Sequence, residues 1–133
     1  METIAINRSL KTAKLIYWIA TGIVFLMDSA LPAFTFNTEL AKEGISHVGY
    51  PDYFRIELSI FKIIGGILLI LPAIPARFKD WAYVGFGLNF ISACIAHCVV
   101  DGFGGDAIFP LVMFVILIVS YVYYHKIKVL QSL

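Results

Sequence analysis

Residues 107–124 read AIFPLVMFVILIVSYVYY, a stretch without a single charged side chain. A helix rises about 1.5 Å per residue, and the apolar core of a bilayer is about 30 Å thick. The stretch is therefore long enough to cross most of a membrane as one helix. The basic residues Lys126 and Lys128 follow it closely, as is typical of the flank of a membrane span.

Three more apolar runs precede this one, at about residues 15–36, 53–71 and 81–100. The 133 residues are 60% hydrophobic and 14% charged, against about 45–50% and about 25% in soluble domains. Each span needs about 20 residues, so four spans and short connections use nearly the whole chain. The sequence predicts one all-α domain, residues 1–133, that forms an integral membrane four-helix bundle. Its spans lie at about 15–36, 53–71, 81–100 and 107–124.

The first run allows one other interpretation. Residues 15–27 resemble the apolar region of a secretory signal peptide, and small residues follow at 29–33. We favour a membrane span because the apolar run continues to Phe36 and three further apolar runs follow.

The basic residues are concentrated in alternate connections. The first connection, a polar segment at residues 37–52, and the third connection together hold only Lys42. Short loops rich in Lys and Arg stay in the cytoplasm, so both termini are predicted to be cytoplasmic. The other flanks hold seven of the ten basic residues: Arg8, Lys11, Lys14, Arg77, Lys79, Lys126 and Lys128.

Some polar side chains fall within the predicted spans. An ionisable group at the bilayer centre costs about 2.5–3.5 kcal/mol, so each one needs a partner or a wet cavity. The helical rise places Lys62 and Asn89 near the middle, and it places Asp28, Arg55, Glu57 and His97 nearer the outer surface. The ionisable residues are therefore expected to gather in the outer half of the bundle.

Helical phase indicates which of these residues face inward. Residues at i, i+4 and i+7 share one face of a helix. Three such stripes are expected to line the interior: Arg55, Ser59, Lys62 and Gly66; Tyr17, Thr21, Val24 and Asp28; and Met113, Leu117, Ser120 and Tyr124. We expect Asp28 to pair with Lys62 or Arg55.

The inward residues suggest a ligand-binding cavity. Its candidate residues are Lys62, Asn89, Asp28, His97, Arg55 and Ser59. The alternative is structural, with charged pairs that fix the register of the bundle while Arg55 and Glu57 extend to the outer surface.

Cys94, His97 and Cys98 share one side of a helix and invite a metal or redox interpretation. Residues at i and i+4 of a helix lack the geometry of a disulfide, and a metal would need further ligands from another span. We therefore expect no metal, and cysteines that act as small apolar residues. A net charge of +1 and the lack of a basic patch exclude nucleic acid as a partner. No catalytic motif is present, so an enzymatic role is disfavoured.

Several short segments resemble one family. They are GYPDYF at 49–54, KIIGG at 62–66, LLILP at 68–72, DWAYVGF at 80–86, and Ala96-His97. In this combination the chain, from about Tyr17 to Tyr124, resembles the DoxX-like family of small four-span membrane proteins. The sequence departs from the family at residues 28–30, where relatives often carry a Ser-Gly pair, and in the extended turn 101–106.

The resemblance implies a multi-pass protein of the bacterial inner membrane with cytoplasmic ends. The family takes its name from a small subunit associated with a thiosulfate:quinone oxidoreductase, and most members of this branch have no established activity. The leading hypothesis is a binding or accessory protein whose cavity holds a small amphipathic or anionic ligand such as a lipid or quinone. A subunit of a quinone-linked oxidoreductase and a small oligomeric transporter are the alternatives. The expected partners are the bilayer, a second copy or a membrane subunit, and a quinone is the one cofactor left open.

Overall fold

The computed structural model describes residues 2–133. Within this range all the regular elements are helices, joined by short connections, which confirms the predicted all-α class. The elements are α1 (Glu2–Phe25), the π-helical turn η1 (Leu26–Ala30), α2 (Leu31–Thr35), α3 (Glu39–His47), α4 (Asp52–Ile70), α5 (Ala76–Asp101) and α6 (Gly105–Gln131).

Three helical segments are long and apolar enough to cross a membrane: the continuous run Glu2–Thr35, α5 and α6. Residues 63–70 of α4 carry no charge, but the part of the helix before them carries Asp52, Arg55, Glu57 and Lys62. By length and composition α4 therefore does not qualify. The chain has the character of a helical membrane protein, and a crossing by α4 stays a prediction.

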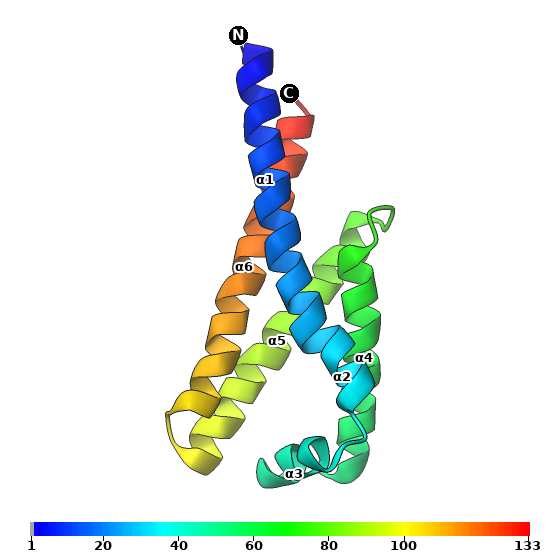
Figure 1. Ribbon diagram of the computed structural model, residues 1–133, viewed down its shortest axis with the longest axis vertical. Coiled ribbons are helices and arrows are strands. Elements are labelled where there is room, and N and C mark those ends of the chain that lie inside the picture. Colours follow the sequence, from blue (N-terminus) through cyan, green and yellow to red (C-terminus); the bar gives the residue numbers. More distant parts are fainter. Residues whose placement is uncertain (1) are drawn as a thin grey trace.

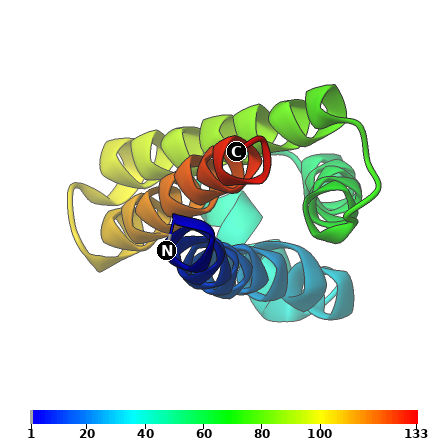
Figure 2. The ribbon, with the colours of Figure 1, turned by 90° about the horizontal axis from the view of Figure 1, so that it is seen from above.

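The long helices run between two ends of an elongated molecule (Figure 1). Both termini lie at one end, while α3 and the α5–α6 turn lie at the other, and the α4–α5 connection points towards the end with the termini but stops well short of it. Helix α6 packs along both α1 and α5, whereas α4 stands to one side with fewer contacts (Figure 2).

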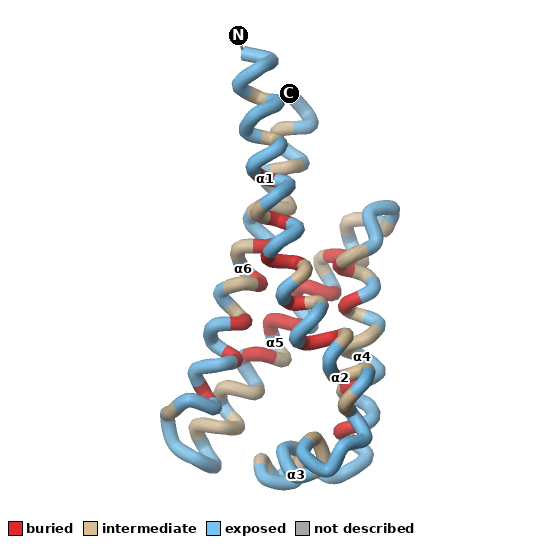
Figure 3. The backbone as a smooth tube through the Cα atoms, in the orientation of Figure 1, coloured by how far each residue is buried: buried red, intermediate tan, exposed pale blue. Residues whose placement is uncertain are grey.

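The core lies at the middle of the molecule's length, where the buried residues of four helices meet (Figure 3). Its apolar members include Val24, Leu69, Phe86, Phe90 and Leu117. The predicted inward stripes are confirmed, because every member is buried except Lys62 and Tyr124, which are partly buried. The outward faces expose many large apolar side chains, as contact with lipid requires.

Close contact between α4 and η1 depends on a glycine. A Cβ atom placed on Gly66 would lie 2.1 Å from Ser29 Oγ and 3.0 Å from Phe25 Cδ2. Only a residue without a side chain fits there, which brings α4 against the turn that holds Asp28.

The π-helical turn follows from a proline. Pro32 has no N–H group, so it cannot donate to the carbonyl of Asp28 four residues earlier. The N–H of Leu31 instead bonds to the carbonyl of Leu26, five residues earlier. Such single-turn π-bulges are frequent at functional sites, and the sequence prediction treated this run as one regular helix.

The predicted polar connection 37–52 contains an additional helix, α3. Thr38 caps its first turn, because the N–H of Ala41 donates to Thr38 Oγ1 at 3.2 Å. Ala41, Gly44, Ile45 and Val48 follow at helical spacing and line a cavity. The connection is therefore an amphipathic helix laid over one end of the long helices.

Candidate ligand-binding site

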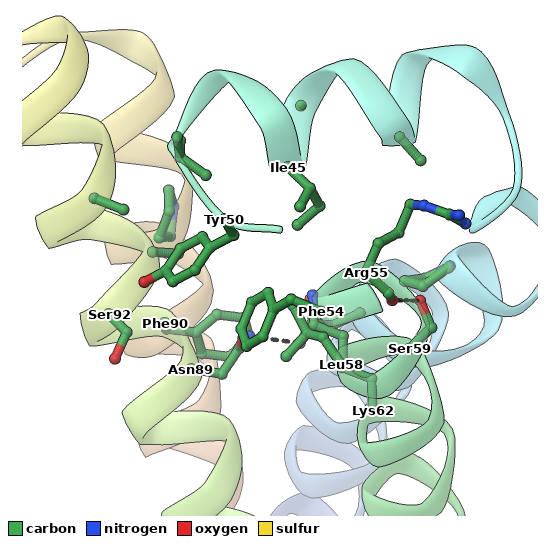
Figure 4. Close-up of a pocket in the computed structure, with 18 of the residues that line it drawn as sticks. Ile45, Tyr50, Phe54, Arg55, Leu58, Ser59, Lys62, Asn89, Phe90 and Ser92 are labelled. Atoms are coloured by element: carbon green, nitrogen blue, oxygen red, sulfur yellow. Dashed lines mark hydrogen bonds and ion pairs between the residues drawn. The ribbon is translucent and has the colours of Figure 1, made fainter. Parts of the chain in front are cut away.

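A cavity of about 500 Å³ lies beneath α3, between α4, α5 and the first turns of α6 (Figure 4). Its lining includes all six candidate residues that the sequence singled out: Asp28, Arg55, Ser59, Lys62, Asn89 and His97. Residues from separate helices are thus brought together around one cavity.

An ion pair supported by an amide forms the floor of the cavity, on the side away from α3 (Figure 4). Lys62 Nζ donates to Asp28 Oδ1 at 3.0 Å, and Asn89 Nδ2 donates to Asp28 Oδ2 at 3.2 Å. The Lys62 and Asp28 side chains are only 19% and 12% exposed. Of the two partners considered for Asp28, the structure selects Lys62.

Hydrogen-bonding capacity remains at this ion pair. An ammonium group has three N–H donors, and Asp28 takes one of those on Lys62. The Asn89 amide donates to Asp28 through nitrogen, which leaves its carbonyl oxygen as an acceptor. The cavity floor can therefore both donate to and accept from a bound molecule.

Arg55 does not take part in the ion pair of Lys62 and Asp28, and it has other partners. Its side chain extends away from the ion pair (Figure 4) and donates to the carbonyl of Phe36 and, at 3.4 Å, to Asn37 Oδ1. At 5% exposure it is buried, so the suggestion that Arg55 reaches the outer surface is wrong. It satisfies the carbonyl of Phe36, the residue that caps the C-terminus of α2, as basic side chains do at helix C-termini. Glu57 is exposed, in line with its opposite phase.

Most of the remaining lining is apolar. Phe54, Leu58, Phe90 and Phe109 contribute to the walls, and Tyr50 stacks on Phe54 with 4.5 Å between ring centroids. Mostly apolar walls with a few placed polar groups are typical of sites for small molecules, which have volumes of about 300–1,000 Å³.

His97 lies at the α3 end of the cavity, where α5 approaches its last turn. Its Nδ1 is 3.5 Å from Asp101 Oδ2, and this buried nitrogen has no hydrogen-bond partner among residues 2–133. Cys94 and Cys98 are free thiols, half-buried on the same helix, and they are not among the residues that line the cavity.

A second polar cluster lies towards the other end of the molecule, where the sequence placed only a basic flank. Lys79 is 4% exposed and donates to the carbonyl of Leu69 at 2.8 Å and to Tyr17 Oη at 3.4 Å. Ser120 Oγ shares hydrogen bonds with Thr21 at 2.6 Å and with Tyr83 at 2.7 Å. The expectation that buried ionisable groups gather in one half is therefore wrong.

These features define a small, all-helical membrane protein with a polar cavity near one end. A model of the DoxX-like family matches residues 16–120. The chain therefore belongs to the DoxX-like family, which confirms the resemblance in its sequence. Neither a curated protein nor a solved structure matches the chain.

Proposed function

We propose that the chain binds a small amphipathic molecule from the membrane, such as a lipid or quinone, in the cavity beneath α3. The observation that carries this proposal is the combination of about 500 Å³ of mostly apolar space with the Lys62–Asp28–Asn89 cluster at its floor. Burying an ion pair is expensive unless its remaining hydrogen-bonding groups find partners. A ligand that bonds to them offsets that cost.

The free groups at the floor favour a head group with hydrogen-bond acceptors. Lys62 offers N–H donors beyond the one used by Asp28. A quinone carbonyl or a lipid ester would accept from them, while Phe54, Phe90 and Leu58 would contact a ring or an acyl chain. Because Asp28 already neutralises the Lys62 ammonium, the head group does not need a full negative charge.

The first experiment fills the cavity. Ala93 lines it from α5, whereas the neighbouring Ile95 is exposed and does not line it. Full-length wild type, Ala93→Phe and the matched control Ile95→Phe are purified in mild detergent, and mass spectrometry identifies the molecules that each retains. We expect a retained lipid or quinone in wild type and Ile95→Phe, and a loss of at least tenfold in Ala93→Phe.

A second variant tests the head-group contact. Asp28→Asn with Lys62→Met removes both charges together and leaves no buried charge unpaired. If this folded double variant and Ala93→Phe both retained the same molecules as wild type, the cavity would not be the binding site. The mass of the retained molecule also identifies its class, so the same measurement distinguishes lipid binding from quinone binding.

We further propose that α4 also crosses the membrane and that both termini face the cytoplasm. The excess of Lys and Arg at the end that holds the termini supports this orientation. A crossing by α4 requires its charged side chains to have partners away from the lipid. Arg55 and Lys62 meet this requirement, because both are bonded inside the protein. Glu57 lies near the outer end of the helix, where it can reach water. The cavity then opens near the outer surface of what we propose is a bacterial inner membrane.

A further inference from the structure

Four side chains that can bind metals converge at the end of the molecule beneath α3. His97 and Asp101 are one helical turn apart on α5, and Asp106 lies in the first turn of α6 beyond a tight glycine-rich turn. One donor atom from each of these three residues lies within 4.8 Å of the others. His47 at the end of α3 bonds through Nε2 to Asp101 Oδ1.

The spacing of these donors suits a single cation. Zn²⁺ binds imidazole nitrogen and carboxylate oxygen at about 2.0–2.2 Å, so donors around one ion lie about 3–4 Å apart. The observed separations, at most 4.8 Å, are somewhat longer than that, so binding would require the side chains to rotate towards the ion. The Nδ1 atom of His97 is buried without a hydrogen-bond partner within residues 2–133, and a metal would satisfy it.

The mixture of donors also restricts the metal. Imidazole suits Zn²⁺ and other late transition metals, while carboxylates alone would suit Mg²⁺ or Ca²⁺. We propose that His97, Asp101 and Asp106 bind a divalent transition-metal ion such as Zn²⁺. The hydrogen bond from His47 holds the Asp101 carboxylate in place, as partners of metal ligands commonly do.

This site differs from the one that the sequence suggested and disfavoured. That grouping joined His97 to Cys94 and Cys98, which lie on the same helix. The new grouping uses His97 with carboxylates from the last turn of α5 and the first turn of α6, and its partner His47 comes from α3. A bound ion would therefore tie α3, through His47 and Asp101, to the α5–α6 turn.

His97 and Asp106 also line the cavity, but metal binding does not depend on the amphipathic ligand or on the Lys62–Asp28–Asn89 cluster. It is tested by calorimetric titration of the purified full-length protein with Zn²⁺, and with Mg²⁺ for comparison. We expect one Zn²⁺ per chain and binding of Mg²⁺ at least tenfold weaker. His97→Gln and Asp106→Asn should each raise the Kd for Zn²⁺ by at least tenfold. His47→Gln should raise it by about tenfold, through loss of support for Asp101.

Two controls distinguish binding at this site from binding to a nearby surface carboxylate or to the cysteine thiols. Glu43→Gln removes an exposed carboxylate from α3 at the same end and should leave the Kd unchanged. Cys94→Ser with Cys98→Ser should also leave it unchanged, and the Co²⁺ form should show no thiolate-to-cobalt absorption. The proposal would be overturned by a folded wild type that binds no Zn²⁺, by binding that survives both His97→Gln and Asp106→Asn, or by binding that the cysteine variant abolishes.

Discussion

The contact between Lys62 and Asp28 is a mostly buried ion pair whose two halves depend on each other. Removing one member leaves the other as an uncompensated buried charge, which typically costs about 3–5 kcal/mol. We expect Lys62→Met to lower the free energy of unfolding by about that amount. Asp28→Asn combined with Lys62→Met should lower it by less, as unfolding in detergent will show. Additive effects of the two single substitutions would contradict a direct coupling.

Gly66 allows a second prediction at the level of one residue. Gly66→Ala would force a Cβ atom against Ser29, and overpacking of this kind typically costs about 1–3 kcal/mol. Gly85→Ala is the matched control, because nothing lies within 4 Å of a Cβ atom there and alanine favours the helix. Thermal unfolding should show a lower Tm for Gly66→Ala only. An equal Tm for the two variants would mean that α4 and η1 do not pack this closely.

The sequence reduced the possible partners of Asp28 to Lys62 and Arg55, because both helices follow a regular rise and phase. It could not predict the backbone partners of Arg55 and Lys79. Both bond to backbone carbonyls near helix ends, those of Phe36 and Leu69. Every residue has a backbone carbonyl. Only the carbonyls at the end of a helix lack an N–H donor within that helix, and no pattern of side chains shows which of them a distant Arg or Lys will bond to.

At the level of elements, α3 was missed for a physical reason. It is nine residues long, and only one side of it is apolar, so its composition resembles that of a polar loop. Thr38, followed by apolar residues at 41, 45 and 48, was the available signal. The π-helical turn could not be predicted because a proline within an apolar run is also compatible with a kinked α-helix. The long apolar runs, in contrast, were predictable from length and hydropathy alone.

The cap of α3 provides a test of this element. Thr38→Ala removes the acceptor for the N–H of Ala41, and loss of such a cap typically costs about 1 kcal/mol. Hydrogen exchange of the α3 amides should become about fivefold faster, because α3 has few other contacts that hold it. Thr35→Ala is the control, since Thr35 Oγ1 bonds only within α2, to the carbonyl of Leu31. Equal exchange in the two variants would show that Thr38 does not stabilise α3.

At the level of the whole molecule, the proposed orientation can be measured with thiol labelling. In a Cys94→Ser and Cys98→Ser background, a single cysteine is introduced as Glu43→Cys on α3 or as Ser132→Cys near the C-terminus. A membrane-impermeant maleimide should label Glu43→Cys in intact cells and Ser132→Cys only after permeabilisation. The reverse result would invert the orientation, and equal labelling in intact cells would contradict the placement of α3 and the C-terminus on opposite sides.

With the α4–α5 connection in the cytoplasm, as we propose, the position of Lys79 implies an order of events when the protein is made. A charge that helps to hold a loop in the cytoplasm acts while the helices are entering the membrane, before they have packed together. In the finished molecule the same ammonium is buried against Leu69 and Tyr17. Lys79 would thus help to set the direction of insertion first and would close the end of α4 afterwards. Lys79 would therefore become buried only when α5 packs against α4, after both helices have entered the membrane.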